Sequence, residues 1–223
     1  MMMGFRLSGP LCATTSPLLD KGTLNPWYTP PPGPVCAVPA LQQARQWHHE
    51  SQAGGFPASA LTMSPEAVAL LKSIEALRLK PYDDQTGGQI EEWVKGATIG
   101  YGHLIAKSEW ATYEDGLTRE EADALFLADA APFEQAVGKT ITVGVQQYEF
   151  DAMVILAFNI GKSGFHDSTI AGMINSYTPG QSLKPLEQAW KAWNKSQGKV
   201  SKGLVNRRAA EWRIYTSAAY ALW

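Results

Sequence analysis

Apolar residues recur at helical spacing beyond Ser64, at Val68, Leu71, Ile74 and Leu77. Ser64 is a favourable N-cap residue, and Pro65 suits the first helical position because its missing N–H would have no helical partner there. Pro81 cannot continue a helix. The pattern therefore predicts a helix that begins after Ser64 and ends before Pro81.

The following segment, residues 82–103, is rich in glycine and β-branched residues. It also contains turn-forming residues at positions 84–88. This combination predicts a small hairpin sheet directly after the first helix.

Helical patterns fill the remainder of the chain. Thr118 and Glu121 form a capping box that opens a helix to about Val137. Residues 146–159 are largely apolar and are followed by Gly161, which predicts a core helix that stops there. Further helices are predicted near residues 168–176, 185–193 and 202–219, and the helical spacing of Trp190, Trp193 and Trp212 favours core packing. The fold class is therefore α+β.

The first 62 residues differ from the rest of the chain. They hold nine of the fourteen prolines, both cysteines (Cys12 and Cys36) and only five charged residues. We predict a poorly ordered, Pro-rich N-terminal extension over residues 1–62 and one domain over residues 63–223. Functional interpretations of the extension are a linker, a proline-rich ligand or a targeting arm. An upstream start codon, with Met63 as the natural start, is the simpler interpretation.

Composition excludes several classes of protein. The 223 residues are 45% hydrophobic and 18% charged, with a formal net charge of -2, which excludes disorder over the whole length and does not favour nucleic-acid binding. Two cysteines are too few for a disulfide framework, and no Cys/His cluster has zinc-site spacing, so we expect no metal and no cofactor. Residues 1–19 carry one basic residue, and glycines and prolines interrupt their apolar runs, which predicts neither a signal peptide nor a transmembrane segment.

Basic residues are concentrated near the end of the chain. Residues 184–213 hold eight basic residues against two acidic ones, a local formal balance of +6. This segment predicts a basic face that attracts anionic cell-wall polymers or lipopolysaccharide. Contact with a membrane surface is an alternative, and a solvated basic face is the simplest interpretation.

Two carboxyl groups in contrasting surroundings flank the start of the predicted sheet. Glu75 has apolar neighbours, which raise the pKa of a carboxyl group and keep it protonated, whereas Asp84 lies among polar turn residues that favour ionisation. A protonated acid and a carboxylate on opposite sides of a sugar ring can hydrolyse a glycosidic bond. Solvated carboxylates are common in such positions, so the pair alone does not decide the function.

Longer motifs surround these two residues. Residues 75–84 read EALRLKPYDD, and residues 98–104 read TIGYGHL. Three later segments follow in order: AFNIG at residues 157–161, Ser168-Thr169, and GLVNRRAAE at residues 203–211. Together they resemble the phage-type lysozymes, the muramidase endolysins of tailed bacteriophages, over residues 64–215.

This resemblance implies a lysozyme fold, with a small sheet-bearing lobe and a larger helical lobe. It also implies cleavage of the β-1,4 bond between N-acetylmuramic acid and N-acetylglucosamine in peptidoglycan. Glu75 takes the family's general-acid position, Asp84 that of the aspartate, and Thr98 that of the threonine that helps hold the attacking water. Because such a water needs space, we expect the inverting carboxyl separation of roughly 6.5–9.5 Å.

The segment between Asp84 and Thr98 departs from the family, in which the aspartate and the threonine stand close in sequence. Here residues 85–97 intervene and include Trp93. Either the longer hairpin extends into solvent, or it places Trp93 or Glu92 over a bound sugar. Asp83 is the neighbouring alternative to Asp84, although only Asp84 keeps the family's spacing from the acid.

Three further residues lie in the shared motifs. Tyr101 is expected to border the substrate, and Asn159 either hydrogen-bonds the acid or caps a helix end. His103 could titrate near neutral pH, but the family motif favours a structural histidine paired with a carboxylate that the sequence does not identify.

The resemblance finally implies an endolysin or its prophage relative, made in the host cytoplasm without a signal peptide. It would reach periplasmic peptidoglycan through a holin-type membrane lesion, and we expect a monomer. The alternatives are a lytic transglycosylase, a non-catalytic peptidoglycan-binding protein of the same fold, and membrane disruption by the basic C-terminal helices.

Overall fold

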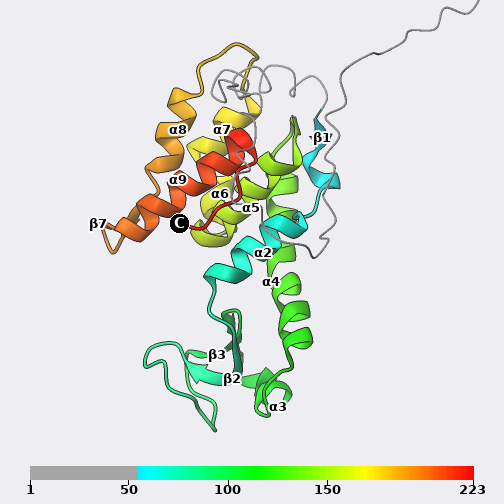
Figure 1. Cartoon of the computed structure of the whole chain (residues 1–223), viewed down its shortest axis with the longest axis vertical. Helices are drawn as coiled ribbons and strands as arrows, with labels where there is room; N and C mark the ends of the chain where they lie inside the picture. Colours follow the sequence, from blue (N-terminus) through cyan, green and yellow to red (C-terminus); the bar gives the residue numbers. More distant parts are fainter. Residues whose placement is uncertain (1–54) are drawn as a thin grey trace, which may run out of the picture. The chain divides into compact units, whose positions relative to one another are not determined.

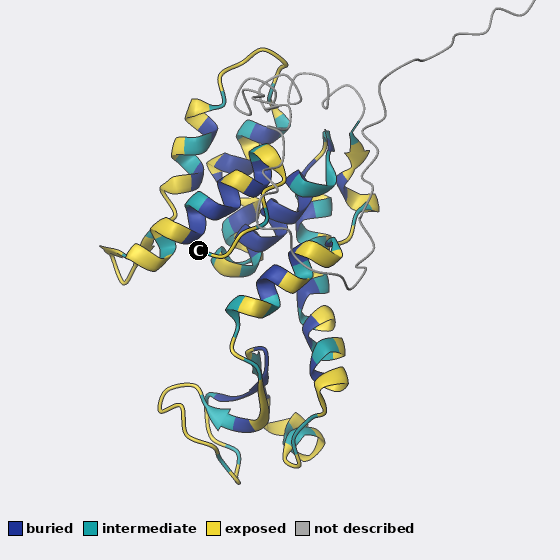
Figure 2. Cartoon of the chain, viewed as in Figure 1, coloured by how far each residue is buried: buried dark blue, intermediate teal, exposed yellow. Residues whose placement is uncertain are grey.

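Helix α5 (Gln147–Ile160) lies at the centre of a helical bundle in the computed structural model, which describes residues 55–223 (Figure 1). Residues 149–157 of this helix are all buried, as expected of a helix that is apolar around most of its circumference. It packs against α2 (Pro65–Ile74), α4 (Arg119–Thr140), α6 (Lys162–His166) and α9 (Lys202–Ser217). The main hydrophobic core therefore surrounds α5 (Figure 2).

Two further helices and a short hairpin complete the bundle. Helix α7 (Thr169–Asn175) contacts α8 (Lys184–Lys191), and α8 packs on α9. The hairpin of β6 (Lys195–Ser196) and β7 (Lys199–Val200) connects α8 to α9.

The tryptophans of this region divide between core and surface. Trp190 of α8 is fully buried, with its ring 5.9 Å from that of Trp212 and 5.1 Å from that of Tyr215 on α9. Core packing of Trp190 and Trp212 is thus confirmed. The prediction for Trp193 is wrong, because α8 ends at Lys191 and Trp193 beyond it is 38% exposed.

A three-stranded antiparallel sheet forms the smaller part of the molecule. Its strand order is β2 (Arg78–Asp83), β3 (Ala97–Gly100) and β4 (His103–Leu104), and the short helices η2 (Lys107–Glu109) and α3 (Trp110–Tyr113) follow. Ala97, Ile99 and Ile105 form its own small core. Helix α4 contacts β3 and β4 as well as α5 and α6, so one long helix joins the sheet to the bundle (Figure 1).

Several predicted helix ends are confirmed by their caps. The Ser64 hydroxyl accepts the Ala67 N–H at 3.1 Å at the start of α2. Thr118 and Glu121 form the predicted capping box of α4. Gly161 ends α5 with a φ of 86°, a conformation that favours glycine.

The end of helix α2 differs from the prediction, which extended the helix towards Pro81. The helix stops at Ile74, and residues 78–83 form a strand. Strand β2 lies at the edge of its sheet, and its register against β3 shifts between Arg78 and Tyr82. Pro81 falls within this irregularity, where a residue without an N–H is tolerated.

Short elements were not predicted, because they are too short to show a periodic pattern. They include α6, the β6–β7 hairpin, and the pairing of β1 (Phe56–Pro57) with β5 (Gly144–Val145). Residues 58–60 form the short helix η1, which contacts α4. Residues 56–60 belong to the segment assigned above to the N-terminal extension, yet they pair and pack with the domain. The rest of that segment, including both cysteines, lies outside the described residues.

A membrane-spanning helix is not found in the described part of the chain, where every helix is too short or too polar to cross a bilayer.

Candidate active site

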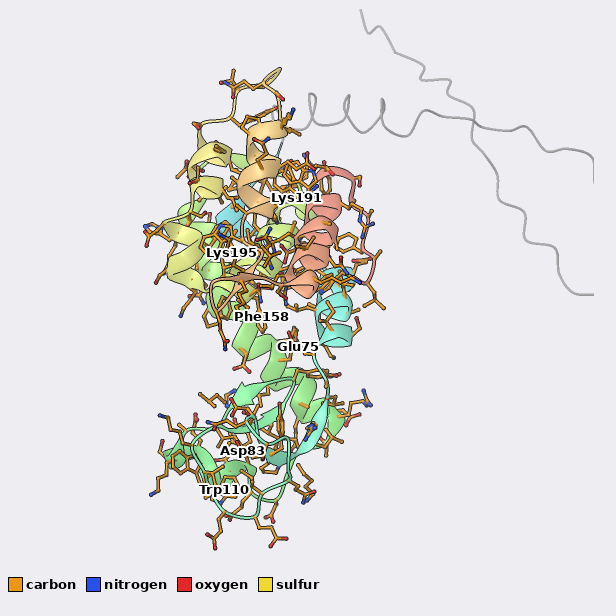
Figure 3. All side chains as sticks on the ribbon, turned by 90° about the vertical axis from the view of Figure 1, so that its left-hand side faces the viewer. Glu75, Asp83, Trp110, Phe158, Lys191 and Lys195 are labelled. Atoms are coloured by element: carbon orange, nitrogen blue, oxygen red, sulfur yellow. The ribbon has the colours of Figure 1, made fainter. Side chains whose placement is uncertain are left out.

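Glu75 occupies the junction between helix α2 and strand β2. It is the C-cap of α2, and its backbone N–H donates to the Leu71 carbonyl at 3.2 Å before the chain turns into an extended conformation. Figure 3 shows Glu75 between the helical bundle and the sheet-bearing part that carries Asp83. The half-buried side chain is thereby held where the two parts of the molecule meet.

Burial raises the pKa of the Glu75 carboxyl above its ordinary value, and the positive charge of Arg207 on α9 partly opposes this effect. The direction agrees with the apolar sequence surroundings of Glu75. A carboxyl group of raised pKa retains its proton to higher pH, which suits a general acid.

Arg207 is itself held by a buried polar network on α9. Its Nε donates to Glu211 at 3.1 Å, and one Nη donates to the Ile155 carbonyl at 3.2 Å. Arg208 donates to the same Glu211 oxygen at 2.8 Å. The predicted basic balance of residues 184–213 therefore overstates the charge at the surface, because Arg207, Arg208 and Glu211 are all buried.

Asp84 follows the last residue of strand β2 and is exposed. Its backbone N–H donates to the Gly96 carbonyl at 3.1 Å. Gly96 has a φ of 100°, and a Cβ added there would collide with the Asp84 carboxylate. The Asp84 side chain is therefore packed directly against the Gly96 backbone.

The Asp83 carboxylate forms hydrogen bonds within the turn that follows β2. Its carboxylate accepts the Gln85 N–H at 3.0 Å and the Thr86 hydroxyl at 2.9 Å. These bonds close the turn at the end of β2. The carboxylate oxygens of Asp84, in contrast, do not take part in this turn.

Thr98 lies on β3 opposite Tyr82, and only 4% of the residue is exposed. Its hydroxyl donates to the Gly96 carbonyl at 2.9 Å, the same oxygen that receives the Asp84 N–H. Tyr82 and Thr98 are cross-strand neighbours, and Asp84 lies two residues after Tyr82 in the turn beyond β2. The fold thus brings Asp84 and Thr98 together although residues 85–97 separate them.

Tyr82 was not identified from the sequence as a site residue. Burial raises the pKa of its hydroxyl, Arg78 opposes the rise, and the negative charges of Asp84 and Glu75 add to it. Tyr82 therefore lies in the electrostatic field of both carboxylates. Its place two residues before Asp84, within the motif of residues 75–84, is the sequence signal that could have identified it.

The structure places the predicted substrate-binding residues as follows. The Tyr101 hydroxyl donates to Asp123 of α4 at 2.9 Å, and its ring packs edge-on against Phe126. Asn159 accepts a hydrogen bond from Arg208 at 2.7 Å, and Gly161 provides the cap at the end of α5. This contact is neither of the two predicted for Asn159.

Trp93 anchors the long hairpin segment. Its Nε1 donates to the Ile105 carbonyl at 3.0 Å, and its ring packs against the small core of the sheet. The Lys107 ammonium lies 5.6 Å from the ring centroid. The segment of residues 85–97 is thus tied back to the sheet by Trp93.

His103 is paired with a carboxylate, as predicted, and the structure identifies the partner. Its Nδ1 lies 3.0 Å from both carboxylate oxygens of Asp129 on α4. This contact ties β4 to the long helix that joins the two parts of the molecule.

With this geometry established, comparisons with known proteins identify the family. Residues 72–211 match the phage lysozyme family. The chain belongs to the phage lysozyme family. This family assignment and the α+β, lysozyme-like fold both confirm the predictions made from the sequence motifs.

Individual relatives agree with this assignment. An endolysin of Bacillus phage PZA is 33% identical over 157 residues, which are 70% of this chain and 56% of the relative. The endolysin of Salmonella phage P22 is 30% identical over 70% of this chain and 99% of its own length. The chain spans about half the length of the Bacillus phage relatives that it matches.

Solved structures of lysozyme relatives share the fold. The endolysin from Escherichia coli O157:H7 phage FAHEc1 has a TM-score of 0.56 and 32% identity, covering 72% of this chain and 97% of its own. The muramidase domain of SpmX from Asticaccaulis excentricus has a TM-score of 0.54 and 30% identity, covering 70% of this chain and 98% of its own.

Proposed function

We propose that this protein is an endolysin that hydrolyses the β-1,4 bond between N-acetylmuramic acid and N-acetylglucosamine in peptidoglycan. The observation that carries the proposal is the contrast between the two carboxyl groups. Glu75 is half-buried with a raised pKa, whereas Asp84 is exposed and its backbone N–H shares the Gly96 carbonyl with the Thr98 hydroxyl. Family membership supports the same chemistry.

In the proposed reaction, Glu75 donates its proton to the glycosidic oxygen as that bond breaks. The Thr98 hydroxyl uses its hydrogen on the Gly96 carbonyl, so its lone pairs can accept a hydrogen bond from a water molecule. Asp84 accepts a proton from that water as the water oxygen attacks the anomeric carbon from the opposite face. Attack from that side inverts the anomeric configuration.

The test is turbidity clearing of purified peptidoglycan by the full chain and by its Glu75→Gln variant. We expect clearing by the wild type alone, products with a reducing-end N-acetylmuramic acid by mass spectrometry, and inverted anomers in proton NMR of fresh products. Retained β-anomers would reject the inverting mechanism. Anhydro products would identify a lytic transglycosylase, and clearing by neither protein would favour a non-catalytic wall-binding protein.

The cellular role proposed here is host lysis by a monomer that acts on periplasmic peptidoglycan after holin-type release. The names of the phage relatives support it, since they are endolysins. Membrane disruption is the competing route to lysis. It predicts that Glu75→Gln still kills permeabilised cells, which a glycosidic mechanism does not allow.

We further propose that an exposed basic face binds anionic polymers of the cell envelope. It consists of Lys184, Lys191, Lys195, Lys199, Lys202 and Arg213 on α8, the β6–β7 hairpin and α9. Figure 3 shows Lys191 and Lys195 on this side of the bundle. Lys191 is paired with Glu187, whereas Lys195 and Lys199 lie on the exposed hairpin.

The test reverses the charges of Lys195, Lys199 and Lys202 and measures binding to whole cell walls at low and high salt. Binding at low salt should weaken, because the attraction between exposed charges is screened by ions. Lys139→Glu on α4, also exposed, serves as the control. Unchanged low-salt binding of the triple variant would reject the electrostatic proposal.

A further inference from the structure

Strand β2 carries an open pocket of about 280 Å³. Arg78, Leu79, Lys80, Tyr82 and Gln89 line it. Two of these five side chains are cationic and none is acidic. Such a lining favours an anionic ligand.

Both cations are held by neutral partners. One Nη of Arg78 donates to the Gly87 carbonyl at 2.5 Å, and the guanidinium lies 4.4 Å from the centroid of the Tyr82 ring. The Lys80 ammonium donates to the Asp115 carbonyl at 2.6 Å. Within residues 55–223, neither side chain forms an ion pair with a carboxylate.

This arrangement fixes the positions of two positive charges without neutralising them. A carbonyl oxygen orients a guanidinium or an ammonium group, and stacking on an aromatic ring restricts a guanidinium further. Donors that remain on both groups can bind an anion, and a guanidinium suits the planar geometry of a carboxylate. The two side chains are therefore ordered before a ligand binds, so binding costs them little further conformational entropy.

Tyr82 connects this pocket to the proposed catalytic residues. It lines the pocket and faces Thr98 across the sheet. The pocket also lies on the strand that runs between Glu75 and Asp84. An anionic group bound there would therefore lie next to a residue that neighbours the proposed water site.

We propose that the pocket of Arg78 and Lys80 binds a carboxylate of the peptide attached to the glycan strand. This inference rests on the proposed function and names the part of the substrate that would confer specificity. On strands that carry their peptides, the lactyl carboxyl group of each N-acetylmuramic acid is used in the amide bond to the peptide. The sugar units are then neutral, whereas the attached peptides bear free carboxylates. The pocket volume suits one small group rather than a length of polymer.

The first experiment compares kcat/KM on glycan strands that carry their peptides with kcat/KM on the same strands after the peptide carboxylates have been converted to amides. For Arg78→Gln/Lys80→Gln, we expect the ratio of the two values to fall by about fivefold to tenfold, the scale of two partly exposed charged hydrogen bonds, mainly through KM. Arg78→Lys, which keeps the charge, should retain part of the ratio. An unchanged ratio in the double variant would overturn the proposal.

A matched control separates the pocket from general attraction. Lys95→Gln removes one exposed positive charge from the same sheet-bearing part, outside the pocket. We expect this variant to keep the wild-type ratio. If Lys95→Gln lowered the ratio as much as Arg78→Gln alone or Lys80→Gln alone, the effect would be unspecific charge attraction and the proposal would be wrong.

The second experiment measures binding without catalysis. The free tetrapeptide of peptidoglycan is titrated into the full chain while NMR follows the Arg78 Nε–H signal. A shift that saturates, and that is absent with the carboxylates amidated, supports the proposal; inorganic phosphate as an equally good ligand would point to a phosphate-bearing polymer and overturn it. This readout does not depend on hydrolysis, so the two proposals can fail separately. If the proposed function is wrong, neither glycan substrate of the first experiment is cleaved. If the pocket proposal is wrong, the titration gives no saturating shift.

Discussion

Asp84 and Thr98 meet at a single backbone oxygen. The Asp84 N–H and the Thr98 hydroxyl both donate to the Gly96 carbonyl, at 3.1 and 2.9 Å. This shared acceptor places the two residues side by side across a segment that is long in sequence. The position of Gly96 should therefore control the proposed water site.

Replacing Gly96 with alanine should lower kcat strongly and lower the free energy of unfolding only modestly. The new Cβ would meet the Asp84 carboxylate, and the φ of 100° adds backbone strain of about 1–2 kcal/mol for a residue with a Cβ. We expect kcat for peptidoglycan hydrolysis to fall by about tenfold or more, since displacement of a reacting group by about 1 Å is costly. Turbidity clearing and thermal unfolding measure the two effects.

Gly102→Ala is the matched control for Gly96→Ala. Gly102 has a φ of 97°, but a Cβ there has no atom within 4 Å. It should therefore show the backbone strain without displacement of Asp84. Equal losses of kcat in the two variants would contradict the link between Gly96 and the Asp84 position.

The Thr98 hydroxyl should matter for hydrolysis and less for folding. Thr98→Val keeps the branched shape in this buried position but removes the group proposed to hold water. We expect kcat to fall by about a hundredfold, the scale of a lost positioning group, and Thr98→Ser to recover much of it. Full activity of Thr98→Val would mean that the water is held elsewhere, or that no water attacks in the first step.

The contact between His103 and Asp129 should contribute to stability. Asp129→Asn removes the carboxylate that lies 3.0 Å from the imidazole, and His103 Nε2 is already buried without a hydrogen-bond partner within residues 55–223. We expect a loss of about 1–3 kcal/mol, or a lower Tm by roughly 2–4 °C for each kcal/mol. Asp115→Asn, at an exposed position, is the control. Equal Tm values for both variants would show that the contact contributes no net stability.

Glu149 should make stability depend on pH. Burial raises its pKa from 4.5 to about 7, although its carboxylate accepts the Gln146 N–H at 2.8 Å. The folded protein therefore binds this proton more tightly than the unfolded chain does. The resulting stability is fully present below pH 4.5 and is lost as pH rises to about 7.

Glu149→Gln should remove this dependence and keep an oxygen that can accept the Gln146 N–H. Across this pH window the wild type should lose on the order of 3 kcal/mol more than the variant, from about 1.4 kcal/mol for each pKa unit. Urea unfolding at several pH values measures the difference, with Glu114→Gln at an exposed position as the control. Parallel curves for wild type and Glu149→Gln would disprove the assignment to Glu149.

The sequence by itself determined the α+β class, most helices and their caps, and the family. Local signals carry this information, because capping residues such as Ser64 and Thr118 act within one turn, and the apolar residues of α5 specify its burial without reference to a partner. The raised pKa of Glu75 also followed from its apolar neighbours in sequence.

Only the tertiary structure decided which distant groups meet. No local pattern indicates that Asp129 pairs with His103, that Arg207 lies in the field of Glu75, or that Gly96 joins Asp84 to Thr98. The strand that replaces the predicted end of helix α2 depends likewise on pairing with β3. These contacts join residues far apart in the chain. Their geometry depends on how the helices and strands pack against one another, and the spacing of residues along the sequence does not specify that packing.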